Sequence, residues 1–357
     1  MNREYSAELK KIEAYLVETL PLPISADWCN RVFPGLGLNA DLAENLIAPC
    51  RDLFGRGGKR WRPLLAHLVC KALGGGDAAL PLLPLVEYCH NASLIHDDLE
   101  DNSEERRGKP AVHLLYGNDT AINAGSFLYF LPLAALENWN AEAEDKNRVW
   151  KLWAEHMRFL HLGQSMDIAW HRDTSYIPSI DDYMVMCSLK TGCLAKFAAI
   201  LGVEAALGNH EENKVRLGGA AQKLGVGFQI LDDVKNLKTG IPGKKRGDDV
   251  VEGKKSLPVL LFLNAWNSNQ PLADGRGGEK RIAFIQRCFK AASAGGADAP
   301  EIEEFIMALT EAGSLEEAEK QGKDLIADAG KVFAGLETAD GEAGRLLAGF
   351  TELLLYA

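Results

Sequence analysis

Apolar residues recur at helical spacing along almost the whole chain, and this periodicity restricts the fold more than any other feature. No segment alternates apolar and polar residues over a length convincing for a β-strand. Helices are predicted over residues 82–101, 149–171, 181–203, 214–237 and 301–309. Ser179 and Asp182 have the spacing of a capping box at one helix start. The sequence therefore predicts an all-α protein with a single large domain over residues 1–357.

Composition excludes several classes of protein. With 47% hydrophobic and 25% charged residues, the chain is not intrinsically disordered. The net charge of −11 argues against a dedicated nucleic-acid binder, which usually has a basic face. The seven cysteines are odd in number and form no CxxC pair, which favours a reducing compartment over a disulfide framework. Because the first residues also lack the apolar core of a signal peptide, we expect a cytoplasmic location.

One uncharged segment, residues 120–136, approaches the roughly 18 residues of a membrane span. It contains Asn123, Gly125 and Pro132, which favour a buried core helix. Pro132 should kink this helix near Leu128, because the proline ring clashes with the carbonyl four residues back. We therefore expect no stable membrane insertion.

The first acidic cluster lies at the end of a predicted apolar helix. Asp97 and Asp101 are four residues apart, so they project from one face of that helix. Two such carboxylates repel each other unless a cation lies between them. A solvated helix end is the alternative interpretation of this cluster alone.

A second acidic cluster strengthens the case for metal binding. Gln229, Asp232, Asp233 and Asn236 form a single helical stripe in strongly apolar surroundings, where carboxylates without partners are costly to bury. Oxygen ligands without histidine or cysteine suit a hard cation such as Mg²⁺, which completes its shell with water and phosphate oxygens. Two such clusters on two helices would clamp a diphosphate.

Basic residues accompany the acidic clusters. Lys59 and Arg62 stand at a predicted helix start, and Arg106 and Arg107 follow the first cluster. Arginine matches phosphate geometry, although surface salt bridges are an alternative explanation. Lys190 is out of place in an apolar helix unless it faces a cavity, and Gly192 predicts a local break there.

With these residues assembled, the sequence closely resembles the trans-type polyprenyl diphosphate synthases, above all the geranylgeranyl diphosphate synthases. The resemblance covers roughly residues 50–265, and residues from about 280 to 357 are predicted to be packing helices. Its motifs, in chain order, are Gly57-Gly58-Lys59-Arg60, Asp97-Asp98-x-x-Asp101, Arg106-Arg107-Gly108, Gly163-Gln164 with Asp167, Lys190-Thr191, and Phe228-Gln229 with Asp232-Asp233.

The resemblance implies the isoprenoid synthase fold, a helical bundle around a central cavity. It also implies a prenyltransferase that condenses isopentenyl diphosphate head to tail with dimethylallyl, geranyl or farnesyl diphosphate. Diphosphate leaves in a carbocation mechanism that depends on Mg²⁺, usually three ions in this family. The released diphosphate is the family's usual base. Family members form homodimers.

Roles follow by resemblance for individual residues. Mg²⁺ would be held by Asp97, Asp101 and Asp232, with Asp98 and Asp233 as supporting ligands or as partners of the basic residues. The allylic diphosphate would meet Arg106, Lys190 and Lys245, and the cation would be stabilised by Thr191 and Gln229. The diphosphate of isopentenyl diphosphate would be bound by Lys59, Arg62, His90 and Arg107. Lys254 and Asp249 match a lid-like stretch, and Gln164 and Asp167 would support the metal site.

One residue departs from the family pattern. The second motif commonly ends in a third aspartate, and here Asn236 occupies that place. An amide keeps an oxygen ligand but loses a charge, so we expect weaker metal binding at the second cluster.

Product length should depend on the residues below the first motif. Ser93, Ala92 and Cys89 form the predicted chain-length wall, and all are small or medium in size. This predicts a pocket deeper than farnesyl length and a geranylgeranyl product, with a floor set by Phe127, Tyr129 or Phe130.

Other functions stay open at this point. The chain could be a synthase of longer or shorter products, or a non-catalytic subunit, although such subunits typically lose one acidic motif. A terpene cyclase would lack the Gly-Gly-Lys-Arg motif and a second aspartate pair. A purely structural acidic bundle would leave Lys190 unexplained.

Overall fold

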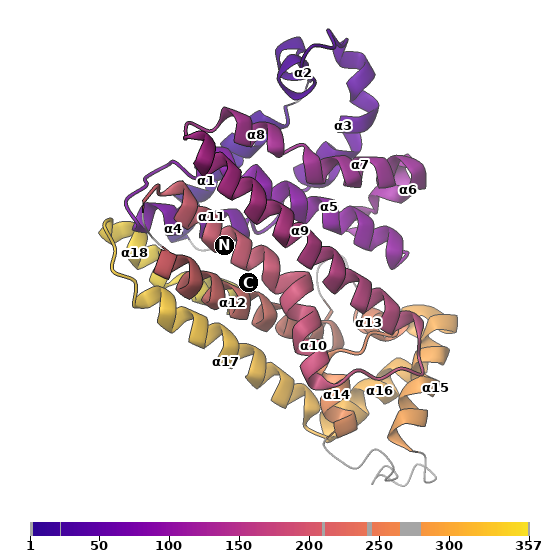
Figure 1. Cartoon of the computed structure of the whole chain (residues 1–357). Helices are drawn as coiled ribbons and strands as arrows, with labels where there is room; N and C mark the ends of the chain where they lie inside the picture. Colours follow the sequence, from indigo (N-terminus) through magenta and orange to yellow (C-terminus); the bar gives the residue numbers. More distant parts are fainter. Residues whose placement is uncertain (1–2, 22, 209–210, 241–244, 265–279, 356–357) are drawn as a thin grey trace. The chain divides into compact units, whose positions relative to one another are not determined.

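The computed structural model describes residues 3–21, 23–208, 211–240, 245–264 and 280–355, which are almost entirely helical (Figure 1). Within these ranges the only strands are β1 (Glu105–Arg106) and β2 (Lys109–Pro110), an antiparallel pair. The predicted all-α class is confirmed. Each predicted helix is present, and the capping box at Ser179 and Asp182 forms with both of its hydrogen bonds.

The chain divides into two compact units. The first unit comprises Met1–Met157, Leu194–Ala221 and Ala329–Ala357, and the second comprises Arg158–Cys193 and Gln222–Asp328. The single domain and the central cavity of the sequence analysis stay predictions.

The first unit contains most of the short helices. These are η1 (Arg3–Tyr5), α1 (Ser6–Thr19), α2 (Ala26–Val32), α3 (Ala40–Gly55), α4 (Trp61–Ala72), η2 (Leu80–Leu82), α5 (Pro84–Glu100), α6 (Val112–Tyr116), α7 (Asn118–Phe130), α8 (Leu133–Asn138), α18 (Gly341–Ala348) and α19 (Phe350–Leu355). Four helices have residues in both units: α9 (Ala143–Arg172), α11 (Cys193–Ala205), α12 (Glu211–Lys238) and α17 (Ser314–Ala334).

The second unit adds a shorter set of elements. These are α10 (Ile180–Cys187), the π-helical turn η3 (Ser188–Gly192), α13 (Asp248–Val251), α14 (Leu257–Asn264), α15 (Arg281–Gly295), η4 (Gly296–Asp298) and α16 (Pro300–Glu311). Its core is an apolar cluster that includes Val234, Phe262 and Phe305.

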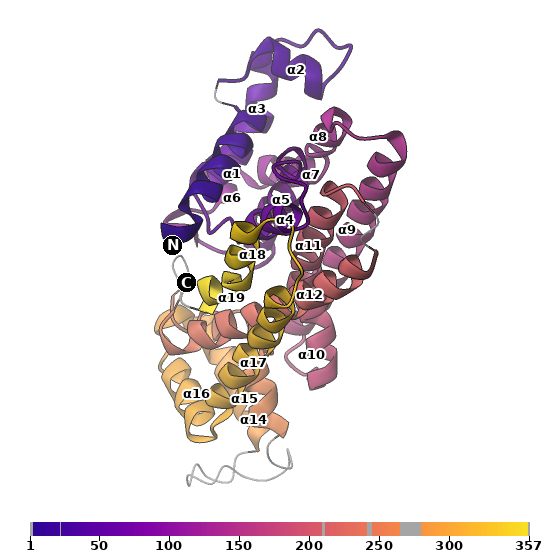
Figure 2. The same cartoon turned by 90° about the vertical axis from the view of Figure 1, so that its left-hand side faces the viewer.

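The core of the first unit is built on α4 and α5. Leu64, Leu65 and Leu68 of α4 are completely buried, because this helix is apolar on nearly every face. The C-terminal part of the chain covers it: α18 lies against α4, and the Ala339 amide donates to the Ala72 carbonyl at 2.8 Å (Figure 2). This contact holds the last residue of α4, and the Gly-Gly-Lys-Arg motif lies before the opposite end of the helix.

The sequence predicts one kinked, buried helix for the uncharged segment 120–136, and the structure differs. The segment forms two helices, α7 and α8, with Pro132 at the N-cap of α8. The proline ends α7 because it has no amide hydrogen and its ring clashes with the preceding turn. Burial is one-sided: Ala121 and Leu128 are buried, whereas Ile122 and Phe130 are 53% and 61% exposed.

Among the described residues, one segment, Ile180–Ala205, is long and apolar enough to cross a membrane. Its most apolar window is 61% buried in the structure, as expected of a core helix.

A buried ion-pair network joins α1 to α4 in the first unit. Glu8 accepts from Lys71 and from His67, each at 2.7 Å, and Asp77 pairs with Lys11 at 3.3 Å. Burial acts to raise the pKa of Glu8, but the two hydrogen bonds outweigh it and lower that pKa below its usual value. Ligand atoms of Glu8, His67 and Asp77 lie within 4.8 Å of one another, a spacing that a metal could bridge. Because lysines already neutralise both carboxylates, we interpret the network as structural.

Candidate active site

The first acidic cluster occupies the C-terminal end of α5. Asp97 and Asp101 are partly buried, and Asp98 is fully buried. Arg106 reaches back from β1 and donates through Nε to Asp98 Oδ1 at 2.8 Å, and its Nη2 lies 3.5 Å from Asp97 Oδ2. Of the two roles predicted for Asp98, supporting ligand or partner of a basic residue, the structure shows the pairing with a basic residue. Asp97 and Asp101 lie one helical turn apart.

A tight hairpin presents two adjacent arginines to different places. The turn between β1 and β2 consists of Arg107 and Gly108, with φ of 53° and 76°, as a two-residue hairpin turn requires. Arg106 is on the strand and pairs with the end of α5, whereas Arg107 is in the turn and contacts α3 and the glycine turn before α4. Arg56, the residue directly after α3, anchors the hairpin by donating to the Arg106 carbonyl at 2.9 Å.

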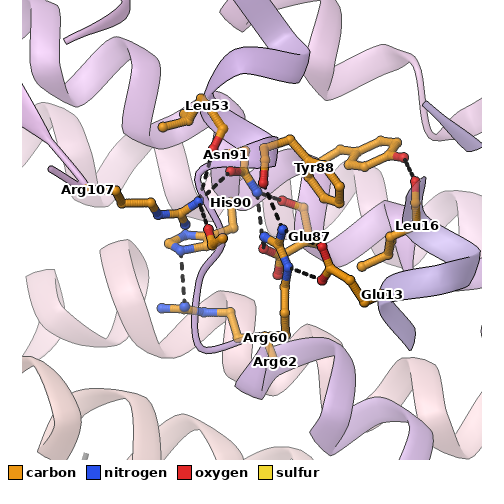
Figure 3. Close-up of polar contacts among 12 residues, drawn as sticks. Glu13, Leu16, Leu53, Arg60, Arg62, Glu87, Tyr88, His90, Asn91 and Arg107 are labelled. Atoms are coloured by element: carbon orange, nitrogen blue, oxygen red, sulfur yellow. Dashed lines mark hydrogen bonds and ion pairs between the residues drawn. The ribbon is translucent and has the colours of Figure 1, made fainter. Parts of the chain in front are cut away.

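The second group of predicted residues, Lys59, Arg62, His90 and Arg107, is called the basic group below. Arg62 lies over the Trp61 ring at 4.3 Å, and its Nη1 is 3.5 Å from His90 Nε2. The His90 imidazole lies between the side chains of Arg62 and Arg107 (Figure 3). The structure thus brings together Arg62, His90 and Arg107, which span 45 positions of the sequence, whereas Lys59 is exposed.

The surroundings of His90 favour its neutral form. Burial lowers its pKa well below the usual value, and the charges of Arg62 and Arg107 lower it further. A neutral imidazole has one accepting and one donating nitrogen, so it can accept from Arg62 and donate to an anion.

The second unit holds Lys190 against Asp167. The Lys190 ammonium donates to Asp167 Oδ2 at 2.6 Å, and both side chains are largely buried. The predicted local break is confirmed, because residues 188–192 form the π-helical turn η3. Gly163 of α9 allows the backbone of this turn to approach α9 closely. A Cβ at position 163 would lie 2.3 Å from the backbone nitrogen of Lys190.

A continuous hydrogen-bonded chain joins three predicted residues of the second unit. Thr191 Oγ1 donates to Gln229 Oε1 at 2.7 Å, and Gln229 Nε2 donates to Asp233 Oδ1 at 2.7 Å. The Tyr183 hydroxyl donates to Asp233 Oδ2 at 2.9 Å. Tyr183 was not predicted, although its position two turns before Lys190 in the same helical segment is a signal that could have identified it.

The Asp233 carboxyl has an unusual acidity. Burial raises its pKa to about 7, and the nearby carboxylate of Asp249 adds to the effect. Hydrogen bonds from Gln229 and Tyr183 act in the opposite direction, as does the charge of Lys254.

The structure shows a bridging role for Asn236, and its part in metal binding stays a prediction. Its side chain is 1% exposed and bridges the backbone of the following segment. The amide oxygen accepts from the Asp249 nitrogen at 3.3 Å, and the amide nitrogen donates to the Lys245 carbonyl at 3.4 Å. An amide can make both bonds because it is donor and acceptor at once.

The two remaining predicted lysines lie near this segment. Lys245 is exposed, and its backbone nitrogen donates to Asp248 Oδ2 at 2.6 Å. The Lys254 ammonium pairs with Glu252 and is 3.9 Å from Asp249. Their contacts with substrate stay predictions.

The residues of the predicted chain-length wall differ in burial, and their role stays a prediction. Cys89 and Ala92 are completely buried, and Ser93 is partly exposed. Cys89 Sγ accepts from the Trp153 indole at 3.4 Å and lies 3.9 Å from the Tyr129 carbonyl. Trp153 was missed by sequence reasoning, because nothing in the sequence relates α9 to α5.

The candidate floor residues also separate in the structure. Tyr129 is 7% exposed beside the wall, whereas Phe127 stacks on Phe33 with ring centroids 5.9 Å apart. Phe130, at 61% exposure, is a poor floor for a pocket of the single chain.

Comparison with known proteins identifies relatives over most of the chain. The family described as Polyprenyl synthetase matches residues 43–288. Geranylfarnesyl diphosphate synthase from Aeropyrum pernix is 30% identical, over 85% of this chain and 92% of that protein. Geranylgeranyl pyrophosphate synthase from Eremothecium gossypii is 34% identical, over 65% of this chain and 73% of that protein. The crystal structure of geranylgeranyl pyrophosphate synthetase from Pyrococcus horikoshii is 28% identical, with a TM-score of 0.79 over 98% of this chain and 96% of that chain.

The close approach at Gly163 yields one prediction. Gly163→Ala should destabilise the protein by about 1–3 kcal/mol, because the new methyl group overlaps the backbone of η3. Denaturant unfolding measures the change. Gly219→Ala in α12 is the matched control, since nothing lies within 4 Å of its Cβ position. Equal stability of the two variants would contradict the proposed close approach.

The bridging role of Asn236 yields a second prediction. Asn236→Asp should cost about 1–3 kcal/mol of unfolding free energy, because a carboxylate oxygen would then face the Lys245 carbonyl. Urea unfolding is the measurement, and Asn118→Asp at the exposed start of α7 is the control with the same chemical change. A variant as stable as the unmodified protein would show that the bridge is dispensable.

Proposed function

This chain is a member of the polyprenyl synthetase family, and from that premise we propose that it is a prenyltransferase that condenses isopentenyl diphosphate head to tail with an allylic diphosphate. The observation that carries the proposal is the hairpin of β1 and β2. Its adjacent arginines, Arg106 and Arg107, join the acidic end of α5 and the basic group respectively. One short element thus serves two sites that suit diphosphates, one through metal and one through cations alone.

We infer that Mg²⁺ is the cofactor, held by Asp97, Asp101 and Asp232, with Asp98 and Asp233 in supporting positions. These ligand sets offer carboxylate oxygens without histidine or cysteine, as a hard cation requires. Bound magnesium would neutralise the negative charge that develops on the departing diphosphate.

The protein's own side chains supply the rest of the chemistry. Lys190, Arg106 and Lys245 would contact the allylic diphosphate and stabilise it as it leaves. Thr191 and Gln229 lock each other's dipoles through their hydrogen bond, so their oxygens can face a carbocation without reacting with it. The released diphosphate would take the proton.

Isopentenyl diphosphate would occupy the basic group. Lys59, Arg62 and Arg107 supply positive charge, and neutral His90 supplies a hydrogen-bond donor without adding further repulsion between cations. A lid role of Lys254 is part of the same proposal.

The proposed product is geranylgeranyl diphosphate. We propose that the small wall residues Cys89, Ala92 and Ser93 leave space for the growing chain below Asp97. The buried rings of Tyr129 and Trp153, whose residues contact Cys89, would form its floor. The relatives with 30% and 34% identity are named for geranylfarnesyl and geranylgeranyl products, so a longer product is the nearest alternative.

We further propose a homodimer in the cytoplasm. Apolar side chains of α6 and α7 are exposed in the single chain, among them Leu114, Ile122 and Phe130. Such a surface favours association with a second copy, and light scattering would test it. The seven cysteines are buried without disulfide bonds, as suits a reducing compartment.

The activity and its metal dependence are tested together. Incubation with Mg²⁺, isopentenyl diphosphate and each allylic diphosphate should yield geranylgeranyl diphosphate on chromatography. Asp97→Asn and Asp232→Asn should each lower kcat by about two orders of magnitude, because each removes charge from a metal ligand set. Glu144→Gln, at a side chain 88% exposed, is the control. A non-catalytic subunit would show no product with any primer, and near-normal turnover of both aspartate variants would contradict the metal clamp.

The wall assignment is tested separately. Ala92→Phe should shift the main product from geranylgeranyl to farnesyl diphosphate, because the ring would fill the space above Cys89. Chromatography of the products from farnesyl and dimethylallyl primers measures the shift. An unchanged product distribution would refute the wall.

A further inference from the structure

Two buried polar residues of α5 lie among the cations of the basic group without belonging to the recognised motifs (Figure 3). Glu87 and Asn91 are one helical turn apart and are 2% and 0% exposed. A buried carboxylate and a buried amide are costly unless each is fully hydrogen-bonded. Their partners therefore indicate why they are there.

Glu87 determines the orientation of the Asn91 amide. The amide nitrogen donates to Glu87 Oε1 at 3.1 Å and to the Glu87 carbonyl at 2.7 Å. Because both bonds need the nitrogen on that side, the amide oxygen is turned the other way. There it accepts from Arg107 Nη1 at 3.3 Å.

Arg60 fixes Glu87 from the other side. Its Nη1 donates to Glu87 Oε1 at 2.6 Å, while its other nitrogens donate to Glu13 and, at 2.8 Å, to the Phe54 carbonyl. The guanidinium also lies 4.2 Å from the Phe54 ring centre and is almost completely buried. Although Arg60 belongs to the Gly-Gly-Lys-Arg motif, its side chain is therefore committed to the protein.

Arg107 is held by one end of its guanidinium. Its three hydrogen bonds, to Asn91, to the Leu53 carbonyl and to the Gly57 carbonyl, all use Nη1. Nη2 lies 3.1 Å from the place where a Cβ of Gly58 would be. These contacts hold the Arg107 guanidinium in a single orientation, in which Nη2 lies over the glycine turn that precedes Lys59.

We propose that Glu87 and Asn91 are positioning residues that aim Arg107 at the diphosphate of isopentenyl diphosphate. The proposal rests on the proposed function and extends it to residues that do not touch substrate. Without the Glu87 carboxylate, the Asn91 amide nitrogen would keep only its bond to the Glu87 carbonyl, so the amide oxygen would be held less firmly toward Arg107. Arg60 and Arg107 would also lose the negative charge between them.

The test separates the two substrates. Asn91→Leu and Glu87→Gln should each raise KM for isopentenyl diphosphate by about 10- to 100-fold, the scale of a lost hydrogen bond to a charged group. KM for the allylic diphosphate should change by less than about threefold, because the acidic cluster is held by Arg106. Glu87→Asp, which keeps the charge, should recover part of the affinity.

A double-mutant cycle tests whether the effect passes through Arg107. In an Arg107→Ala background, Asn91→Leu should change KM for isopentenyl diphosphate by less than about twofold, because the group it positions is gone. Additive effects of the two substitutions would overturn the proposal. Asn91→Leu leaves the Arg60–Glu87 ion pair in place, so it decides the question even if Glu87→Gln does not fold.

The matched control is Glu8→Gln. Glu8 is also a buried carboxylate of the first unit with a lysine at 2.7 Å, but its partners lie in the α1–α4 network. This variant should lower the melting temperature without changing either KM. If Glu87→Gln behaves in the same way, its role is only structural and the proposal is wrong. If the unmodified protein makes no product, the proposed function fails, and this inference fails with it. If it makes product but Glu87→Gln and Asn91→Leu leave KM for isopentenyl diphosphate unchanged, this inference alone is overturned.

Discussion

Repulsion between cations that await an anionic ligand is the constraint on which the first unit's site depends. Arg60, Arg62 and Arg107 gather where burial weakens solvation, and a buried charge is tolerated only with partners. The chain meets this demand with two carboxylates, Glu87 and Glu13, and with a histidine, His90, whose pKa is held well below its usual value. Binding of a diphosphate would then add negative charge to a group that is already rigid, so little ordering would be required of the side chains.

The second unit meets a related constraint by backbone geometry. A lysine in an apolar helix needs a place where its side chain can reach a polar partner. The π-helical turn η3 provides this place, because it interrupts the regular helix at Lys190. The π-turn is possible because Gly163 lets α9 approach its backbone. Asp167, one turn further along α9, then pairs with the same lysine. The Gly163, Gln164 and Asp167 motif is thus a packing requirement as well as a polar one.

Sequence alone predicted the features that depend on local spacing: the helices, the aspartates on α5 and α12, the basic residues and the break at Lys190. It did not predict contacts between elements that are distant in the chain. Trp153 meets Cys89 across 64 positions and Tyr183 meets Asp233 across 50. Spacing within one helix relates Tyr183 to Lys190, but it does not identify the partner of either residue on another helix. The segment 120–136 was misjudged because the absence of charge does not distinguish a helix buried on one side from one buried on all sides.

Asn236 illustrates how charge limits the second cluster. Burial and Asp249 already raise the pKa of Asp233 to about 7. A third carboxylate at position 236 would add repulsion and raise the pKa of its neighbours further. The amide removes that charge and ties the following segment to α12 through two backbone hydrogen bonds. The loss of one potential ligand charge is thereby accompanied by two hydrogen bonds that hold the segment around Asp249 to α12.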